Sequence, residues 1–344
     1  MGNKLLAEAA TAAGFPRTSV FAWDLVMKQQ PDDKANTMKY CQALVNNGEV
    51  AKAEERCAAL ENGVGSTETA SGHAAQILAL FPLMQPGDEI VAANKLYGGS
   101  INQMGHSYRK FGWSAKFVDP DDPENFRRAS TNKTRAFFIE SLANPGGVVT
   151  DMEAIAKIAH DTGVPLIVDN TMATPYLCRP FEHGADIIVH STTKFLSGNG
   201  TALGGMVIDS GNFNWMQNDK FPSMSQPAPE YHNLTFAETF GELSYTIYGH
   251  AIGLRDLGAA QSPMNAFLTL LGIETLPLRM DKHCANALAV AQHLSNHHAV
   301  NWVSYAGLES DKYYALGQRY LPKGAGAVMT VGLKGGYDAG VKLV

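Results

Sequence analysis

The chain has 344 residues, of which 45% are hydrophobic and 17% are charged, and its formal net charge at pH 7 is −6. This length allows one large α/β domain with a smaller partner domain, and the mildly acidic balance gives no electrostatic basis for binding nucleic acid or an anionic membrane. We find no apolar run of membrane length and no cleavable signal, so neither a membrane nor a nucleic acid is expected as a partner.

The four cysteines are scattered along the chain without the paired spacing of a metal site or a disulfide framework. They are Cys41, Cys57, Cys178 and Cys284. Such a pattern favours reduced, mostly buried thiols in a cytoplasmic protein. The adjacent histidines at 297–298 lie at a polar helix end, so we expect no metal site.

Apolar runs typical of buried strands alternate with helical segments along the chain. A helix covers about residues 71–84, and a second runs from Asp151, a start signal, to Gly163, a stop signal. The strand-like runs are residues 88–92, 114–118, 135–140, 165–169, 185–190 and 204–208. This alternation predicts an α/β fold with a mostly parallel central sheet.

The last third of the chain has a different pattern. A long helix, Arg279 to Leu294, leads into strand-like segments at 302–306 and 327–333. We therefore predict a large domain of residues 49–275, followed by a smaller α+β domain of residues 276–344. Residues 1–48 form a separate N-terminal arm in this prediction.

A lysine follows the predicted strand 185–190, in the sequence His190-Ser-Thr-Thr-Lys194-Phe195. Open α/β sheets bind ligands at the carboxyl ends of their strands, and a desolvated lysine amine there is a nucleophile. The hydroxyls of Ser191 and Thr193 suit a phosphate group. Taken alone, a lysine such as Lys194 after a strand is more often a solvated surface residue.

A carboxylate, Asp169, ends the predicted strand 165–169. Pyridoxal phosphate needs this pair of groups: a lysine bonds to its aldehyde, and a carboxylate keeps its pyridine nitrogen protonated so that the ring accepts electrons. The alternative is that Asp169 caps a following turn. Lys194 and Asp169 together predict a pyridoxal-phosphate site.

Two further segments suit this cofactor. Small residues at 69–76 precede an Ala/Leu-rich helix, whose N-terminus would attract an anion, although Ser71 could also be an ordinary N-cap. Tyr97 precedes two glycines after the strand 88–92, where its ring could stack on a flat cofactor or simply cover a turn.

From about Glu49 onward, the chain resembles the pyridoxal-phosphate enzymes of cysteine and methionine metabolism, which have the aspartate-aminotransferase-like fold (fold type I). The resemblance rests on ASGHAAQ (70–76), KLYGGS (95–100), FIESLANPGG (138–147), PLIVDNTMATPYLCRP (165–180) and HSTTKF (190–195).

The resemblance implies a role for each matching residue. Lys194 would bond to the cofactor aldehyde, and Asp169 would pair with the pyridine nitrogen. Tyr97 would stack on the ring and assist proton transfer, and Asn144 would donate a hydrogen bond to the phenolic oxygen. The implied phosphate contacts are Ser71, Gly72, His73, Ser191 and Thr193.

Within this family, the second half of the chain resembles the O-acetylhomoserine sulfhydrylases (O-acetylhomoserine aminocarboxypropyltransferases). The segments concerned are PAPEYHNLTF (227–236), LRDLGAAQSPMNAFLTLLGIETLPLRM (254–280), WVSYAGL (302–308) and YLPKGAGAV (320–328). This likeness implies γ-replacement on O-acetylhomoserine by sulfide or a thiol, giving homocysteine or methionine and acetate, in sulfur amino-acid biosynthesis. It also implies a homo-oligomer, a dimer or a tetramer.

The chain departs from the family pattern at both ends. The family's Tyr-x-Arg pair, which holds a neighbouring subunit's cofactor phosphate, is replaced by Gln42 and Leu44, and residues 1–40 show no resemblance. At the other end, the family continues beyond Val344 to an arginine that holds the substrate carboxylate, and no arginine follows Arg319 here. Loss of the phosphate contact alone predicts cofactor binding weaker by about tenfold to a few hundredfold.

These departures leave two alternatives to a sulfhydrylase. One is a catalytically impaired or non-catalytic relative that folds and binds the cofactor. The other is an enzyme similar to cystathionine γ-synthase or methionine γ-lyase, which share the core motifs but look less like the second-half segments.

Overall fold

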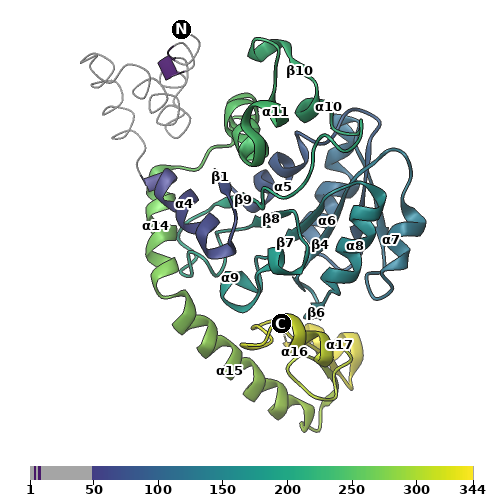
Figure 1. The fold of residues 1–344 in the computed structure, drawn as a ribbon. Coiled ribbons are helices and arrows are strands. Elements are labelled where there is room, and N and C mark those ends of the chain that lie inside the picture. Colours follow the sequence, from purple (N-terminus) through teal and green to yellow (C-terminus); the bar gives the residue numbers. More distant parts are fainter. Residues whose placement is uncertain (1–3, 5–6, 9–48, 344) are drawn as a thin grey trace. The chain divides into compact units, whose positions relative to one another are not determined.

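The computed structural model describes residues 4, 7–8 and 49–343 (Figure 1). Two compact units make up the chain: unit 1 contains Met1–Leu83 and Val189–Gly272, and unit 2 contains Met84–Ile188 and Ile273–Val344. Each unit therefore combines two separate stretches of sequence. The domain boundaries predicted at residues 48 and 275 remain a prediction.

The parallel part of the central sheet lies in unit 2. Its strands are β2 (Glu89–Ala93), β3 (Ser114–Val118), β4 (Thr134–Glu140) and β7 (Leu166–Asp169). They are arranged in the order β7-β4-β2-β3, and all their pairings are parallel. Apolar runs make β2, β4 and β7 almost entirely buried, as parallel strands covered on both faces require. These strands were predicted from their sequences, and the α/β class is confirmed.

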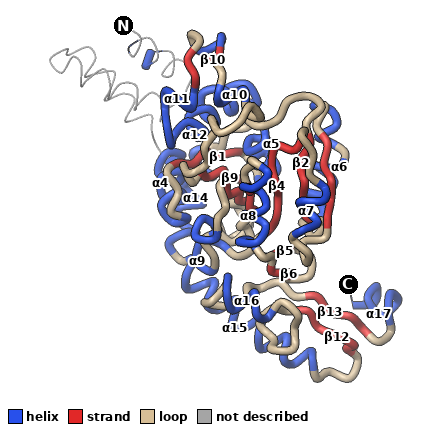
Figure 2. The backbone as a smooth tube through the Cα atoms, turned by 45° about the vertical axis from the view of Figure 1, so that its right-hand side comes forward, coloured by secondary structure: helices blue, strands red, loops and turns tan. Residues whose placement is uncertain are grey.

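Helices pack on this part of the sheet. Figure 2 shows α7 (Glu124–Ala129) and α8 (Met152–Thr162) beside the parallel strands, where α7 contacts α8, β2 and β3, and α8 also contacts β7. Asp151 caps α8 by accepting a hydrogen bond from the Ala154 N–H at 3.3 Å, and Gly163 ends it with a φ of 73°. The helix predicted between Asp151 and Gly163 is thus confirmed at both ends.

The C-terminal stretch of unit 2 begins with α15 (Leu276–Ser295), close to the predicted helix 279–294. It leads to an antiparallel pair, β12 (Val300–Ser304) and β13 (Thr330–Leu333), at the predicted places. Unit 2 also includes α6 (Gly98–Gly105), α9 (Thr174–Leu177), α16 (Tyr314–Tyr320), α17 (Gly336–Leu343), β5 (Leu142–Ala143) and β6 (Val148–Val149).

In unit 1, β1 (Gly65–Thr69) pairs antiparallel with β9 (Gly205–Asp209), and β9 also neighbours β8 (Ile187–His190). The last two residues of β8 belong to unit 1. Helix α4 (Glu49–Glu61) contacts β1, and α5 (Gly72–Leu80) contacts β9. The remaining elements include β10 (Pro227–Ala228), β11 (Leu234–Thr235), α10 (Pro222–Ser225), α11 (Phe236–Phe240), α12 (Ser244–Tyr248), α13 (Arg255–Leu257) and α14 (Pro263–Glu274), whose last two residues belong to unit 2.

Glu68, on β1, is a buried carboxyl group in unit 1. Its side chain is fully buried, and neither carboxyl oxygen has a hydrogen-bond partner among the residues that the structure describes. The Glu68 backbone N–H donates to Glu54 Oε1 at 2.9 Å, which places a second buried carboxylate next to it. Burial, together with the charge of Glu54, raises the pKa of Glu68 to about 9.

We expect Glu68→Gln to stabilise the protein at neutral pH. The folded-state pKa of about 9 lies above the unfolded value of about 4.3, so the folded state binds more protons between these values and loses stability as the pH rises through them. A neutral amide avoids this loss, which gives a gain of about 1–3 kcal/mol at pH 7 and none near pH 4. Urea denaturation of both proteins at the two pH values measures the difference.

Glu89→Gln is the matched control, because Glu89 is also buried but is well bonded. Burial by itself raises its pKa, but hydrogen bonds from Thr131, Lys116 and Thr134 outweigh burial and lower the pKa. The amide should therefore destabilise the protein at pH 7. A Glu68→Gln protein that loses stability at pH 7 as Glu89→Gln does would contradict our reading of Glu68.

Candidate active site

In unit 1, the start of α5 and the loop after β8 are in direct contact. A Cβ atom placed on Gly72 would lie 2.7 Å from the Ser191 Cβ, so only glycine fits there without displacement. Ser71 caps α5 by accepting a hydrogen bond from the Ala74 N–H at 3.1 Å. The structure therefore brings together the predicted phosphate contacts of both segments: Ser71, Gly72 and His73 with Ser191 and Thr193.

This arrangement fits a phosphate group. The first turn of α5 carries no acidic side chain, and a helix N-terminus presents backbone N–H groups and the positive end of the helix dipole. The close approach of Gly72 to Ser191 adds a hydroxyl-bearing loop beside that N-terminus. The cap by Ser71, considered from sequence as an alternative, is present together with these features.

Lys194 lies in a turn whose backbone is held by hydrogen bonds. Its N–H donates to the Ser191 carbonyl at 3.2 Å, and its carbonyl accepts from the Gly198 N–H at 2.8 Å. The Thr193 hydroxyl donates to the Gly204 carbonyl at 3.2 Å and accepts from the Gly204 N–H at 3.1 Å, which joins the loop to the residue before β9. A fixed backbone thus presents the lysine.

The surroundings of Lys194 differ from the desolvated amine that the sequence argument assumes. The side chain is exposed, in the hydrogen-bonded turn that follows β8. An exposed amine is accessible to an aldehyde. The buried neighbours of this turn are Thr192 and Leu196, on either side of the lysine.

In unit 2, three predicted site residues gather around a fourth residue, Glu140, at the carboxyl end of β4. Glu140 Oε1 accepts a hydrogen bond from the Tyr97 N–H at 2.7 Å, and Oε2 accepts one from the Asn144 N–H at 2.9 Å. In the pairing of β4 with β7, Glu140 is the direct partner of Asp169. The structure therefore brings Tyr97, Asn144 and Asp169 together within this unit.

Each of these residues has a defined local setting. Tyr97 precedes α6, and 49% of its surface is exposed, which leaves its ring accessible for stacking. Asp169 Oδ1 accepts a hydrogen bond from the Thr171 N–H at 3.0 Å, so the turn-capping alternative also applies to it. Burial, together with the charge of Asp169, raises the pKa of Glu140 to about 8, while the N–H groups of Tyr97 and Asn144 act in the opposite direction.

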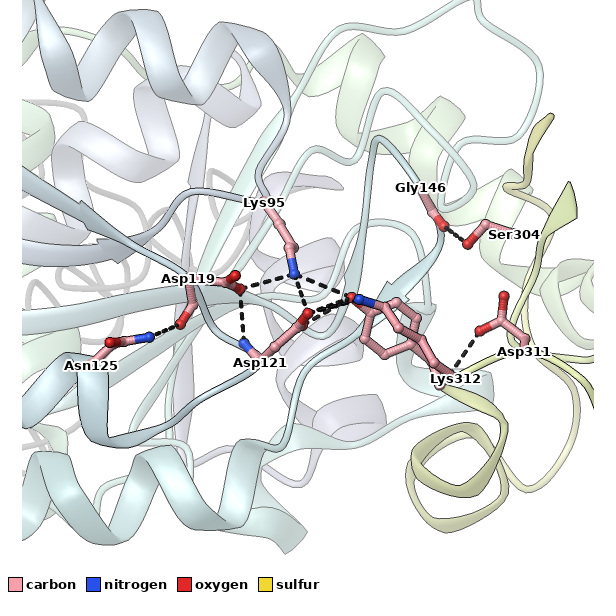
Figure 3. A network of polar contacts seen from close by, with 9 residues as sticks. Lys95, Asp119, Asp121, Asn125, Gly146, Ser304, Asp311 and Lys312 are labelled. Carbon is pink, nitrogen blue, oxygen red and sulfur yellow. Dashed lines mark hydrogen bonds and ion pairs between the residues drawn. The ribbon is translucent and has the colours of Figure 1, made fainter. Parts of the chain in front are cut away.

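A polar network, missed by the sequence reasoning, holds the loop before Tyr97 (Figure 3). The Lys95 ammonium forms ion pairs with Asp119 at 2.9 Å and Asp121 at 2.5 Å, and it donates to the Tyr313 hydroxyl at 3.2 Å. The Tyr313 hydroxyl donates to Asp121 Oδ1 at 2.9 Å. The C-terminal stretch of unit 2 therefore anchors the loop that carries the tyrosine.

A second anchor holds the loop that carries Asn144. The Ser304 hydroxyl, on β12, donates to the Gly146 carbonyl at 3.1 Å (Figure 3). Glu140 and Lys95 had no assigned role in the sequence reasoning, although Glu140 lies in the quoted segment FIESLANPGG. The available signal was its place at the end of a predicted strand, the same kind of position as Asp169.

The remaining sequence predictions concern the N-terminal arm, the cysteines, metal sites and membrane helices. Gln42, Leu44 and Cys41 lie outside the described residues. Cys57, Cys178 and Cys284 are free and buried. Across residues 4, 7–8 and 49–343, no group of three or more His, Cys, Asp or Glu side chains is arranged to hold a metal ion. Among the helices in those ranges, none combines the length and the apolar character that crossing a membrane requires.

Comparison with known families decides the class of the protein. The sequence model of the Cys/Met metabolism PLP-dependent enzymes matches residues 3–344. The chain belongs to this family. Its cofactor is accordingly pyridoxal phosphate, which confirms the prediction from Lys194 and Asp169. The match begins at residue 3, so it includes residues 3–40, in which the sequence motifs show no likeness.

Two relatives with high sequence identity have names that refer to homocysteine synthesis or to O-acetylhomoserine. The chain is 48% identical over 300 residues to the O-acetyl-L-homoserine sulfhydrylase of Leptospira meyeri, covering 85% of this chain and 68% of that protein. It is 46% identical over 293 residues to the homocysteine synthase of Schizosaccharomyces pombe, again covering 85% of this chain and 68% of the relative.

Solved structures confirm the pyridoxal-phosphate fold type I. A Campylobacter jejuni protein, assigned as an O-acetylhomoserine (thiol)-lyase, matches with a TM-score of 0.81 and 37% identity over 83% of this chain and 72% of that one. Its structure contains a pyridoxyl-lysine phosphate. The O-acetylhomoserine sulfhydrylase of Wolinella succinogenes matches with a TM-score of 0.74 and 34% identity over 83% of this chain and 77% of that one.

Proposed function

We propose that this chain catalyses γ-replacement on O-acetylhomoserine, in which sulfide or a thiol displaces acetate and gives homocysteine or methionine. The observation that carries the proposal is the contact of Gly72 with Ser191, because the start of a helix beside the Lys194 loop is suited to the phosphate of the cofactor. The names of the relatives with 48% and 46% identity support the choice of substrate.

The residues of unit 1 bind the phosphate and supply the amine in this proposal. The phosphate contacts are Ser71, Gly72, His73, Ser191 and Thr193, at the start of α5 and in the loop after β8. Lys194 bonds to the cofactor aldehyde, for which an exposed amine on a fixed backbone is suited.

The residues of unit 2 act on the ring. Tyr97 would stack on it, Asn144 would donate a hydrogen bond to its phenolic oxygen, and the Asp169 carboxylate would hold its pyridine nitrogen protonated. The exposure of the Tyr97 ring and the shared bonding of Tyr97 and Asn144 to Glu140 support these roles.

The proposed chemistry depends on proton movements at the substrate. When bound, pyridoxal phosphate withdraws electrons from the substrate amino acid and acidifies its α- and β-carbon protons. The free Lys194 amine would take the substrate α-proton as a general base and later return it; a second proton would leave the β-carbon before acetate departs and would be returned after the sulfur adds. Tyr97 assists proton movement near the γ-carbon, where acetate leaves and the sulfur of sulfide adds. The net exchange is acetate for sulfide, without oxidation or reduction.

We also propose a homo-oligomer, either a dimer or a tetramer. Within unit 1, the side chains of Met264, Phe267 and Leu271 on α14 are exposed. Leu203 is also exposed, and it lies close to α14 because the Asn265 side chain donates a hydrogen bond to the Leu203 carbonyl at 2.9 Å. Spacings of three and four residues place the α14 side chains on one face, and exposed apolar faces of this kind often form subunit contacts.

Two further assignments complete the proposal. A cytoplasmic location agrees with the free, buried thiols of Cys57, Cys178 and Cys284. Residues 49–275 would form the cofactor-binding large domain and residues 276–344 the smaller domain.

The reaction itself is the test of the proposed function. The purified chain is incubated with O-acetylhomoserine, sulfide and pyridoxal phosphate, and homocysteine and acetate are measured. We expect both products in equal amounts, and neither when O-acetylhomoserine is omitted. Release of ammonia and an oxo acid without sulfide would assign the chain to the lyases. Cofactor binding without any product would assign it to the non-catalytic relatives.

A further inference from the structure

We infer that Glu140 is a positioning residue, whose single carboxyl group fixes the backbone of Tyr97 and of Asn144 and so aligns the ring and the amide that face the cofactor. The inference rests on the function proposed for Tyr97 and Asn144. Glu140 itself is 4% exposed, so it acts through these two residues and not by contact with a substrate.

The geometry is that of a clamp between two loops. One carboxyl oxygen of Glu140 accepts the Tyr97 N–H at 2.7 Å, and the other accepts the Asn144 N–H at 2.9 Å. Tyr97 is 43 residues before Glu140 in the sequence, whereas Asn144 is four residues after it. One side chain therefore sets the distance between two loops that the local sequence does not join.

Both backbone N–H groups belong to irregular segments. Tyr97 immediately precedes α6, with φ −49° and ψ 131°, so its N–H lies outside the hydrogen bonding of the helix. Asn144 follows the two-residue strand β5, where regular pairing has ended. A backbone N–H of this kind needs a partner from a side chain or from water, and Glu140 supplies a fixed one.

The buried site of Glu140 is energetically unfavourable for an ionised carboxyl group, which suggests that the group has a specific role there. Glu140 is buried and lies opposite Asp169 in the pairing of β4 with β7, so burial and like charge both oppose its ionised form. The two N–H donors compensate part of this cost. Lys95, two residues before Tyr97, and Gly146, two residues after Asn144, are held separately by Tyr313 and Ser304 (Figure 3).

Glu140→Gln tests the clamp with little change of shape. An amide has one acceptor oxygen, and its NH₂ group would face an N–H donor, so one of the two hydrogen bonds is lost. Glu89→Gln is the matched control, because Glu89 is a buried carboxylate of the neighbouring strand β2 that accepts hydrogen bonds from Lys116, Thr131 and Thr134.

The first measurement uses the protein without added cofactor. Amide hydrogen exchange should become faster by about tenfold or more at Tyr97 or Asn144 in Glu140→Gln, and should stay unchanged at both in Glu89→Gln. The second measurement uses protein reconstituted with pyridoxal phosphate. The absorbance maximum and circular dichroism of the bound cofactor should change only in Glu140→Gln, and kcat should fall by about 10- to 100-fold with a smaller change in KM.

Unchanged exchange at both amides, or equal spectral changes in the two variants, would overturn the inference. If Glu140→Gln does not fold, the same measurements are made on Glu140→Asp. Its side chain is shorter by one methylene, so its carboxyl group cannot accept hydrogen bonds from both N–H groups. A wild-type protein that binds the cofactor but forms no homocysteine would refute the proposed reaction alone, because exchange and cofactor spectra still decide the role of Glu140.

Discussion

Replacing Lys194 with alanine is expected to abolish the covalent attachment of pyridoxal phosphate and to lower homocysteine formation by at least about 10³-fold. The amine serves twice in the proposed chemistry, first as the nucleophile toward the aldehyde and then as the base at the α-carbon. Its exposure means that alanine leaves no cavity, so the fold should be retained. Borohydride reduction followed by peptide mapping measures the attachment, and the wild-type label should lie on the peptide that contains Lys194.

Lys157→Ala is the control for this substitution. Lys157 is an exposed lysine on α8 whose ammonium lies 3.8 Å from Asp161, an ion pair of little energetic weight. The control should keep full labelling and full activity. A label found mainly on Lys157 or Lys133 in the wild-type protein would show that the wrong lysine has been assigned.

The elements that sequence could predict are those with local signals. Helix α8 was predicted at both ends because Asp151 and Gly163 mark its limits in the sequence itself. The strands β2, β4 and β7 were predicted because their apolar runs are long enough to stand out.

Strand β1 was missed for the converse reason. Its sequence, GSTET, contains no apolar side chain, yet all five residues are buried. Two of its polar groups find partners on helix α4: the Ser66 hydroxyl donates to the Glu54 carbonyl at 2.6 Å, and the Glu68 N–H donates to the Glu54 side chain. A pattern of hydrophobicity cannot reveal a buried strand whose residues are polar.

The candidate site was predictable as residue types but not as a set of contacts. Lys194, Asp169 and Tyr97 follow strands, which sequence can indicate, but the exposure of Lys194 depends on the turn after β8. Glu140 and Lys95 were missed because their partners are distant, 43 residues away for Tyr97 and 218 for Tyr313. No local pattern records a contact of that kind.

Asp169→Asn is expected to retain cofactor binding but to lower kcat for homocysteine formation by about 10²–10³-fold. A carboxylate favours the adjacent protonated pyridine nitrogen through its charge, and a neutral amide does not, so the ring would accept electrons poorly. Cofactor content, measured by absorbance after release in alkali, should match the wild-type value. Asp161→Asn, at an exposed position on α8, is the control and should leave kcat unchanged.

The substitution also separates the two roles that Asp169 can have. Its Oδ1 accepts the Thr171 N–H at 3.0 Å, and asparagine keeps an oxygen that can accept the same hydrogen bond. A residue that only caps this turn would therefore tolerate asparagine with unchanged turnover, and that result would contradict the role at the ring. Removal of the charge should in addition lower the pKa of Glu140 from about 8, because Asp169 contributes to raising it. A large loss of kcat with intact cofactor binding would show that the reaction depends on the charge of Asp169 and not on its hydrogen bond.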